Sequence, residues 1–323
     1  MTAPSSAGQG SGDGRIVFEN VSKFYGEVLG VNRVDLSIPP GTTGLVGPNG
    51  AGKTTIMNLM TGLLRPSQGA IRTLGIPPER PDELFRVVGY CTQFDSFPPG
   101  VTGLEFLLRY LRLHGHGRAV AERLAWQALE RVGLADAAAR RVAGYSKGMR
   151  QRVKLANAIA HDPRVLLLDE PLNGLDPLAR ADAIALFRSL AAEGRHLLIS
   201  SHILHELDQI ADFVVILDGG YVVAEGDVHA LRTEIATEPL RILIRCDRPE
   251  AVAAEAFARR DIVAAEITAD RSAVIVSTAE VDAFYQHLNR MVLEQRVAIA
   301  AVEPMDDDVH ALYSYVVRSE RYV

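Results

Sequence analysis

A phosphate-binding pattern stands at residues 47–54. These residues read Gly-Pro-Asn-Gly-Ala-Gly-Lys-Thr and fit G-x-x-x-x-G-K-[ST]. In such a loop, glycines let successive backbone N–H groups point at phosphate oxygens, and the following helix adds positive partial charge. Lys53 would reach the outer phosphates, and the Thr54 hydroxyl would bind Mg²⁺. The pattern therefore predicts a nucleotide phosphate site, whereas the alternative is an ordinary glycine-rich turn.

Two adjacent carboxylates, Asp169 and Glu170, follow the apolar run Val165 to Leu168. A continuous apolar run predicts a strand buried on both faces, as in a parallel sheet. Charged groups at the end of such a strand are costly unless they serve a metal or a polarised water. We therefore expect Asp169 to bind Mg²⁺ and Glu170 to activate the attacking water as a general base. The alternative is a strand end capped by surface acids.

Three further side chains stand where they could face the same ligand. Gln93 and His202 follow the predicted strands Val87 to Thr92 and His196 to Ser200, and strand ends are where α/β sheets place ligands. Gln93 could reach a metal or a water, or it could be a solvated loop residue. The loop behind it, with Phe94 and Phe97, is a candidate surface for a partner, and the alternative is that these rings pack inside the protein. Tyr25 could stack on a base, or it could pack in the core.

A serine and a glycine stand before a predicted helix, Arg150 to Ala160, in the sequence Tyr145-Ser146-Lys147-Gly148-Met149. The Ser146 hydroxyl, free N–H groups and the helix dipole together could form an anion site. A plain helix cap is the alternative. The spacing alone favours the cap.

The elements that must hold these residues follow from the apolar pattern. Lys53 to Leu63 follows the glycine loop, which predicts strand, loop and helix. Arg15 to Asn20 and Val31 to Ile38 alternate apolar and polar residues, which predicts an opening antiparallel piece. Further predicted elements in this part are strands Gly69 to Leu74, Phe213 to Leu217 and Tyr221 to Ala224, and helices Thr102 to His114, Arg118 to Val132 and Leu178 to Ala192.

The last part of the chain predicts a second, smaller domain. Its strands and helices follow the order βαββαβ, the split-βαβ or ferredoxin-like arrangement. These elements are Leu240 to Cys246, Glu250 to Arg259, Ile262 to Thr268, Ala273 to Ser277, Glu280 to Leu293 and Val297 to Val302. It holds no cluster of catalytic residue types, so we expect regulation or dimer contact, with the amphipathic segment Asp306 to Val317 docked on it. The expected division is a disordered tail at 1–14, a nucleotide-binding domain at 15–232 and an α+β domain at 233–323.

Composition narrows the class of protein. The 323 residues suggest about two domains, and no apolar run approaches the roughly 20 residues of a membrane-spanning helix. We therefore do not expect the chain to cross a membrane by itself. A formal net charge of −6 gives no overall electrostatic reason to bind nucleic acid. Cys91 and Cys246 share no metal-ligand spacing and are expected to be buried, reduced thiols.

Taken together, these motifs resemble the nucleotide-binding domain of ATP-binding cassette (ABC) proteins over residues 15–232. The resemblance implies a P-loop cassette of mixed sheet and helical subdomain, with ATP and Mg²⁺ as ligands. The implied catalytic residues are Glu170, His202, Gln93 and Lys53, and the implied metal-binding residues are Thr54, Gln93 and Asp169. The implied ATP-binding residues are Tyr25, Gly47, Pro48, Asn49, Gly50, Ala51, Gly52, Lys53, Thr54, Thr55, Ser146, Gly148 and Asp176.

The family also implies partners. Its cassettes dimerise head to tail, with each ATP between one phosphate loop and the signature helix of the other subunit, so Ser146 is expected to bind phosphate after all. The family signature Leu-Ser-Gly-Gly-Gln is altered at Lys147 and Met149, as in subunits that drive export of drugs or polysaccharides through separately encoded membrane proteins. We expect a homodimer at the cytoplasmic face of the inner membrane. The alternatives are an ABC ATPase that acts on ribosomes or DNA, and a nucleotide-binding module without turnover.

Overall fold

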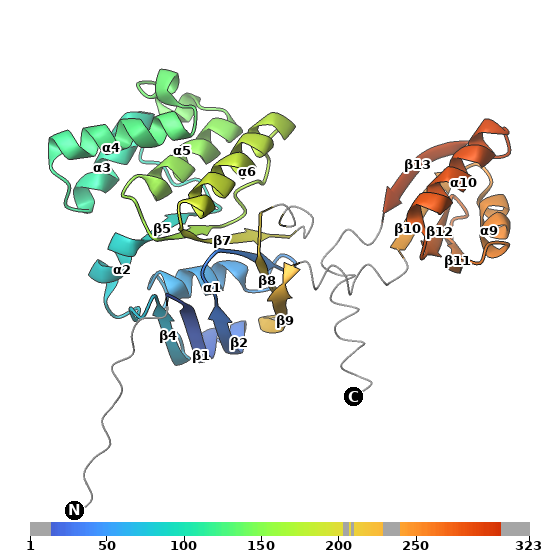
Figure 1. The fold of residues 1–323 in the computed structure, drawn as a ribbon, viewed down its shortest axis with the longest axis horizontal. Helices are drawn as coiled ribbons and strands as arrows, with labels where there is room; N and C mark the ends of the chain where they lie inside the picture. The colour runs from blue at the N-terminus through green and yellow to red at the C-terminus, as the bar shows by residue number, and fades with distance from the viewer. Residues whose placement is uncertain (1–13, 203–206, 208–209, 229–239, 305–323) are drawn as a thin grey trace, which may run out of the picture. The chain divides into compact units, whose positions relative to one another are not determined.

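The computed structural model describes residues 14–202, 207, 210–228 and 240–304 (Figure 1). They form two compact units, divided between Gly226 and Asp227. The expected boundary after residue 232 and the amphipathic segment at 306–317 lie outside the described residues, as does the expected tail at 1–14 except for Gly14.

The first unit opens with an antiparallel sheet of strand order β2-β1-β4, in which β1 and β2 form the predicted antiparallel piece. Its strands are β1 (Ile16–Tyr25), β2 (Val28–Ile38) and β4 (Gln68–Thr73). Apolar side chains on alternate positions face the core, as Ile16 and Phe18 do. Helix α1 (Lys53–Met60) belongs to the same core, because Ile56, Met57 and Met60 are fully buried against both sheets of this unit.

A second sheet positions the chemistry. In the described part of this unit its strand order is β5-β6-β7-β3-β8-β9, and the neighbours from β5 to β8 are parallel. The strands are β5 (Val88–Cys91), β6 (Val165–Leu168), β7 (His196–Ser201), β3 (Thr42–Val46), β8 (Phe213–Asp218) and β9 (Tyr221–Asp227). Parallel strands share one carboxyl edge. The glycine loop, Gln93, the two carboxylates and His202 therefore meet at that edge.

Helices lie above this sheet in Figure 1. They are α3 (Gly103–Leu113), α4 (Arg118–Arg131), α5 (Lys147–Ile159) and α6 (Pro177–Ala192), with α2 (Pro81–Val87) before β5 and short 3-10 turns at Ala135–Ala137 and Val142–Gly144. Thr102 and Glu105 form a capping box at the start of α3. Helix α5 begins three residues earlier than predicted, because the Ser146 hydroxyl accepts the Met149 N–H and caps it there.

The second unit has the predicted βαββαβ order. Its elements are β10 (Leu240–Cys246), α9 (Pro249–Phe257), β11 (Ile262–Ile267), β12 (Ala273–Thr278), α10 (Val281–Leu293) and β13 (Ile299–Pro304). The sheet is antiparallel with order β11-β12-β10-β13, so β12 lies between the strands that α9 connects. Phe284 and Leu288 of α10 fill its core with Ile242 and Ile244. Both cysteines are free thiols, but Cys246 is only partly buried.

Candidate nucleotide-binding site

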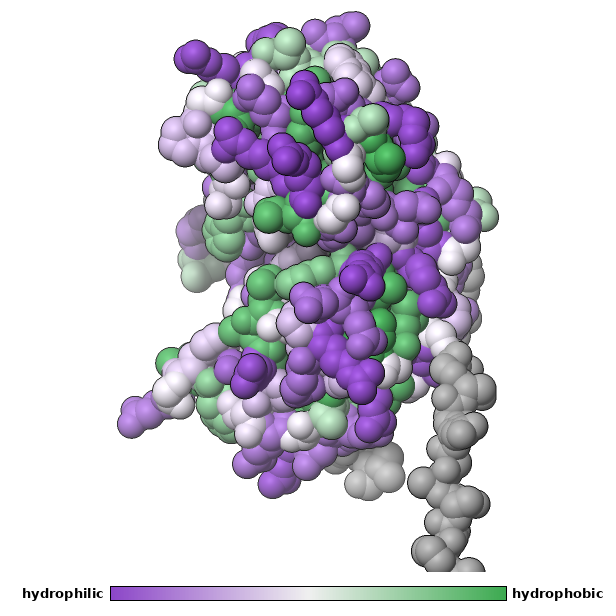
Figure 2. Space-filling view, turned by 90° about the vertical axis from the view of Figure 1, so that its left-hand side faces the viewer, coloured by the Kyte–Doolittle hydropathy of each residue, from purple (hydrophilic) through white to green (hydrophobic). Residues whose placement is uncertain are grey.

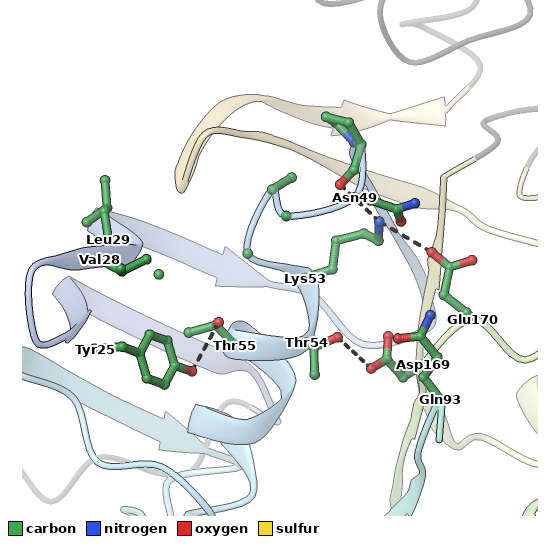
Figure 3. Close-up of a pocket in the computed structure, with 15 residues that line it drawn as sticks. Tyr25, Val28, Leu29, Asn49, Lys53, Thr54, Thr55, Gln93, Asp169 and Glu170 are labelled. Atoms are coloured by element: carbon green, nitrogen blue, oxygen red, sulfur yellow. Dashed lines mark hydrogen bonds and ion pairs between the residues drawn. The ribbon is translucent and has the colours of Figure 1, made fainter. Parts of the chain in front are cut away.

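An open pocket lies beside the glycine loop (Figure 3). It gathers twelve of the predicted site residues from four strand ends and α1. They are Tyr25, Pro48, Asn49, Gly50, Ala51, Gly52, Lys53, Thr54, Thr55, Gln93, Asp169 and Glu170. Val28, Leu29 and Gly30 also line it and were missed by the sequence reasoning. Because they belong to a strand of ordinary apolar pattern, only the fold reveals their position.

Backbone geometry explains two of the loop glycines. Gly52 has φ +106°, which L side chains rarely adopt, and a Cβ there would lie 2.8 Å from the Gly30 carbonyl oxygen. A Cβ on Gly47 would lie 2.4 Å from the Leu217 carbonyl oxygen. Any larger residue would therefore displace the loop from the strands that hold it.

Lys53 is a buried ammonium at the base of the pocket. Its Nζ donates to the carbonyl oxygens of Gly47 at 2.6 Å and Pro48 at 3.3 Å, and it lies 3.3 Å from Glu170 Oε1. The lysine side chain is only 7 % exposed and the glutamate 4 %, so solvent screens this pair little. A cation in this position can bind a phosphate oxygen of a ligand in the pocket.

Thr54 and Asp169 bring two oxygen ligands together. The Thr54 hydroxyl donates to Asp169 Oδ2 at 2.7 Å, and Asp169 is buried (Figure 3). Mg²⁺ takes oxygen ligands and is commonly held by one or two carboxylates together with substrate phosphates. Across the described residues, no cluster of three or more His, Cys, Asp or Glu side chains could hold a metal. The Thr54 hydroxyl and the Asp169 carboxylate are oxygen donors of the kind that Mg²⁺ takes.

Ser200 orders both carboxylates and was missed by the sequence reasoning. Its hydroxyl donates to Asp169 Oδ1 at 2.7 Å and accepts the Glu170 backbone N–H at 2.8 Å. Glu170 has φ +49°, an uncommon conformation for a residue with a Cβ. A polar residue at the end of the apolar strand β7 was the available signal, because that strand lies beside β6.

Glu170 is the best candidate for the general base. His202 Nδ1 lies 2.9 Å from its Oε2, whereas its Oε1 faces Lys53. The histidine is 40 % exposed at its side chain, so it links the buried carboxylate to solvent. Burial raises the pKa of the neighbouring Cys91 thiol to about 12, and burial with the charge of Asp169 raises the pKa of Tyr90. Both groups are therefore neutral near pH 7 and do not compete as bases.

Tyr25 stands at the rim of the pocket. It is 45 % exposed, and its hydroxyl lies 3.3 Å from Thr55 Oγ1 (Figure 3). Of the two interpretations given to it, core packing is therefore wrong. An exposed ring beside the phosphate loop is free to stack on a base.

Four predicted ATP-binding residues and the predicted catalytic His202 do not line this pocket. Gly47 instead accepts a hydrogen bond from Lys53 Nζ at its carbonyl oxygen. Ser146 and Gly148 lie at the start of α5, and Asp176 caps α6 by accepting the Ala179 N–H at 2.9 Å. Within one chain, Ser146 and Asp176 thus act as helix caps. The start of α5 remains accessible, since Ser146 and Lys147 are exposed.

The loop after Gln93 is split between solvent and interior. Phe94 is 75 % exposed, as a contact surface requires. Phe97 is only partly exposed and packs edge-on against Phe106 of α3 with ring centroids 5.1 Å apart. This contact is the packing inside the protein that the alternative interpretation of this loop predicts.

Comparisons with known proteins agree with this geometry. Residues 31–173 match the family model described as ABC transporter. A Nod factor export ATP-binding protein I of Burkholderia orbicola is 40 % identical over 230 residues, which cover 70 % of this chain and 76 % of that protein. A daunorubicin/doxorubicin resistance ATP-binding protein of Streptomyces peucetius is 37 % identical over 222 residues, covering 68 % and 67 %.

Solved structures show the same fold. An ATP-binding subunit of an ABC transporter superposes with a TM-score of 0.62 at 29 % identity, covering 68 % of this chain and 92 % of that one. A dimeric bacterial ABC transporter cassette gives a TM-score of 0.62 at 26 % identity, covering 66 % and 98 %. Among the described residues, no helix combines the length and the apolar character needed to cross a membrane.

Proposed function

The chain belongs to the ABC transporter family as an ATP-binding subunit that hydrolyses ATP to energise transport, and we propose how its residues divide this work. The observation that carries the proposal is the buried Glu170 carboxylate, held between Lys53 and His202 beside the Thr54–Asp169 pair. The names of the relatives favour export over an action on ribosomes or DNA.

Each group in the pocket has one task in hydrolysis. Tyr25 stacks on the base, and the loop N–H groups with Lys53 bind the phosphates. Thr54, Asp169 and Gln93 would hold Mg²⁺, which would neutralise charge on the phosphate oxygens when bound. Glu170 accepts a proton from the attacking water, and His202 keeps that carboxylate oriented. Ser200 fixes the backbone from which Glu170 projects.

A second copy of the chain completes the site. Ser146 and Gly148 lie outside the pocket of their own chain, while the start of α5 offers free N–H groups and a positive dipole end to an anion. Head-to-tail pairing would bring these groups onto the ATP of the opposite cassette. We infer a homodimer, as the similarity to a dimeric cassette supports.

A separate integral membrane protein receives the movement that ATP binding causes in the cassette. Phe94 projects from the loop that carries Gln93, and the ring chain Phe97, Phe106 and Tyr110 joins that loop to α3 with centroid distances of 5.1 and 5.0 Å. Figure 2 views the side on which α2 and α3 lie in Figure 1, and apolar residues gather about its middle among hydrophilic ones. We place the docking surface at Phe94 and Tyr110, and the chain at the cytoplasmic face of the inner membrane.

Membrane attachment of the Phe94→Ser variant tests this proposal. The variant should bind ATP like the wild type but leave the membrane fraction and stop export, because an apolar docking side chain is lost. Phe257→Ser is the matched control, because it also removes an exposed phenyl ring but lies in the C-terminal unit. This variant should stay attached to the membrane. Full attachment and export by Phe94→Ser would overturn the docking assignment.

A further inference from the structure

We propose that Lys154 is a positioning residue that sets the direction of Gln93 and ties it to the signature helix. The inference rests on the proposed role of Gln93 in the ATP site. Lys154 is a buried cation in the middle of α5, outside the nucleotide pocket.

Lys154 is buried and fully hydrogen-bonded. Its side chain is 7 % exposed, although it sits between Val153 and Leu155 in a helix that packs on β5. The ammonium donates to the carbonyl oxygens of Thr92 and Gln93, both at 3.0 Å, and lies 3.1 Å from Asp95 Oδ1. An ammonium has three donors, and here two of them bind backbone carbonyls while its charge is paired with Asp95.

The two carbonyls define the backbone of Gln93. The Thr92 carbonyl belongs to the peptide plane before the Gln93 Cα, and the Gln93 carbonyl belongs to the plane after it. Holding both planes fixes φ and ψ at that Cα, and these angles set where the side chain points. Gln93 is itself exposed and lines the nucleotide pocket beside Asp169 (Figure 3). Without this anchor, an exposed loop residue would have many directions available.

A second cation extends the anchor to the signature. Asp95 Oδ2 accepts from Arg150 Nε at 2.8 Å, and Arg150 Nη1 donates to the Tyr145 carbonyl at 2.7 Å. Tyr145 directly precedes Ser146, the cap of α5. The loop of Gln93 and the start of the signature helix are therefore joined through Lys154, Asp95 and Arg150. A movement of Gln93 when ATP binds would therefore be transmitted to Ser146.

A lysine that only stabilised the fold could donate to any backbone carbonyls that lack another partner. Here both backbone acceptors flank the one residue that lines the nucleotide pocket from the β5 end. The favoured role is therefore to direct Gln93. The two roles differ in one measurable respect, because a residue that acts through Gln93 has no further effect on turnover when the Gln93 side chain is absent.

A double-mutant cycle on ATP turnover tests the inference. We would measure kcat and KM of the full chain with Gln93→Ala, Lys154→Met and the double variant. Each single variant should lower kcat roughly 10- to 100-fold, the scale of a misplaced group, with KM changed by less than about threefold. The double variant should be no slower than Gln93→Ala. If Lys154→Met folds poorly, Asp95→Ala can replace it, because the Asp95 side chain is more exposed. Asp95→Ala should lower kcat less than Lys154→Met does, and it should have no further effect on kcat in the Gln93→Ala background.

Arg152→Met is the matched control. Arg152 lies on the same helix and also donates to a backbone carbonyl, that of Val132 at 3.4 Å, away from the Gln93 loop. Whatever fold reduction in kcat Arg152→Met causes alone, the double variant with Gln93→Ala should show the product of the two single reductions. If the Lys154 and Gln93 effects multiply in the same way, or if Lys154→Met leaves kcat unchanged, the inference is wrong. If Gln93→Ala alone leaves kcat unchanged, the proposed role of Gln93 fails and the inference fails with it.

Discussion

Ser200→Ala should destabilise the protein and impair turnover at the same time. The substitution removes a hydroxyl whose two hydrogen bonds, to Asp169 Oδ1 at 2.7 Å and from the Glu170 N–H at 2.8 Å, are both buried. A buried N–H left unsatisfied costs about 1–3 kcal/mol, and a lost hydrogen bond to a charged group costs about 1.5–3 kcal/mol. Since Asp169 keeps its bond from Thr54, we expect a total loss of about 3 kcal/mol in the free energy of unfolding.

Urea unfolding of the two proteins measures this loss directly. The midpoint should fall while the m-value stays the same, because the surface exposed on unfolding does not change. ATP turnover should fall at least tenfold, because the Ser200 hydroxyl binds the backbone N–H of Glu170, whose φ is +49°.

Ser22→Ala is the matched control for Ser200→Ala. The Ser22 hydroxyl is also buried, donates to Asn32 Oδ1 at 3.1 Å and accepts the N–H of Arg33, whose φ is +46°. It should therefore lose stability as well, yet keep its turnover per folded molecule. A Ser200→Ala protein that lost less than about 1 kcal/mol, or that hydrolysed ATP like the Ser22 control, would refute this account of the strand end.

Three other outcomes follow from the same geometry. Saturating ATP should convert Glu170→Gln from monomer to dimer, and a variant that stays monomeric by light scattering would count against the shared site. Lys53→Ala should weaken ATP binding at least tenfold by titration calorimetry, since it removes the phosphate-facing cation. Burial lowers the pKa of His161, which stacks on His114, to about 4. The unfolded value is about 6.5, so this stability is complete above pH 6.5 and is lost as the pH falls toward 4. Between pH 7.5 and 5, His161→Phe should remove about 2 kcal/mol of the pH dependence of unfolding, and an unchanged slope would contradict the assignment.

Most strands and motif positions of the cassette could be predicted from the sequence, because each motif borders a strong apolar pattern. The run Val165 to Leu168 predicted a strand buried on both faces, and β6 is buried throughout and parallel to both neighbours. Its position then placed Asp169 and Glu170 at the carboxyl edge. The βαββαβ order of the second unit was equally readable, since its strands alternate and its helices are bounded by Pro249 and Glu280.

The residues that sequence reasoning did not predict are those whose role depends on contacts with residues far away in the sequence. Ser200 lies 30 and 31 residues from its two hydrogen-bond partners, and Lys154 lies about sixty from its own, so no local pattern marks either of them. The contact of Phe97 with Phe106 likewise joins a loop to the next helix, and no local pattern marks it. The start of α5 shifted because a cap is decided by one hydrogen bond, which apolar periodicity does not contain.

Steady-state ATP turnover of Glu170→Gln, measured together with its ATP affinity, tests whether Glu170 is the base of an ATP-hydrolysing site. The glutamine keeps the shape of the side chain and loses the carboxylate that takes the proton, so turnover should fall roughly a hundredfold or more while ATP still binds. Hydrolysis by Glu170→Gln at the wild-type rate, with ATP binding intact, would contradict the account.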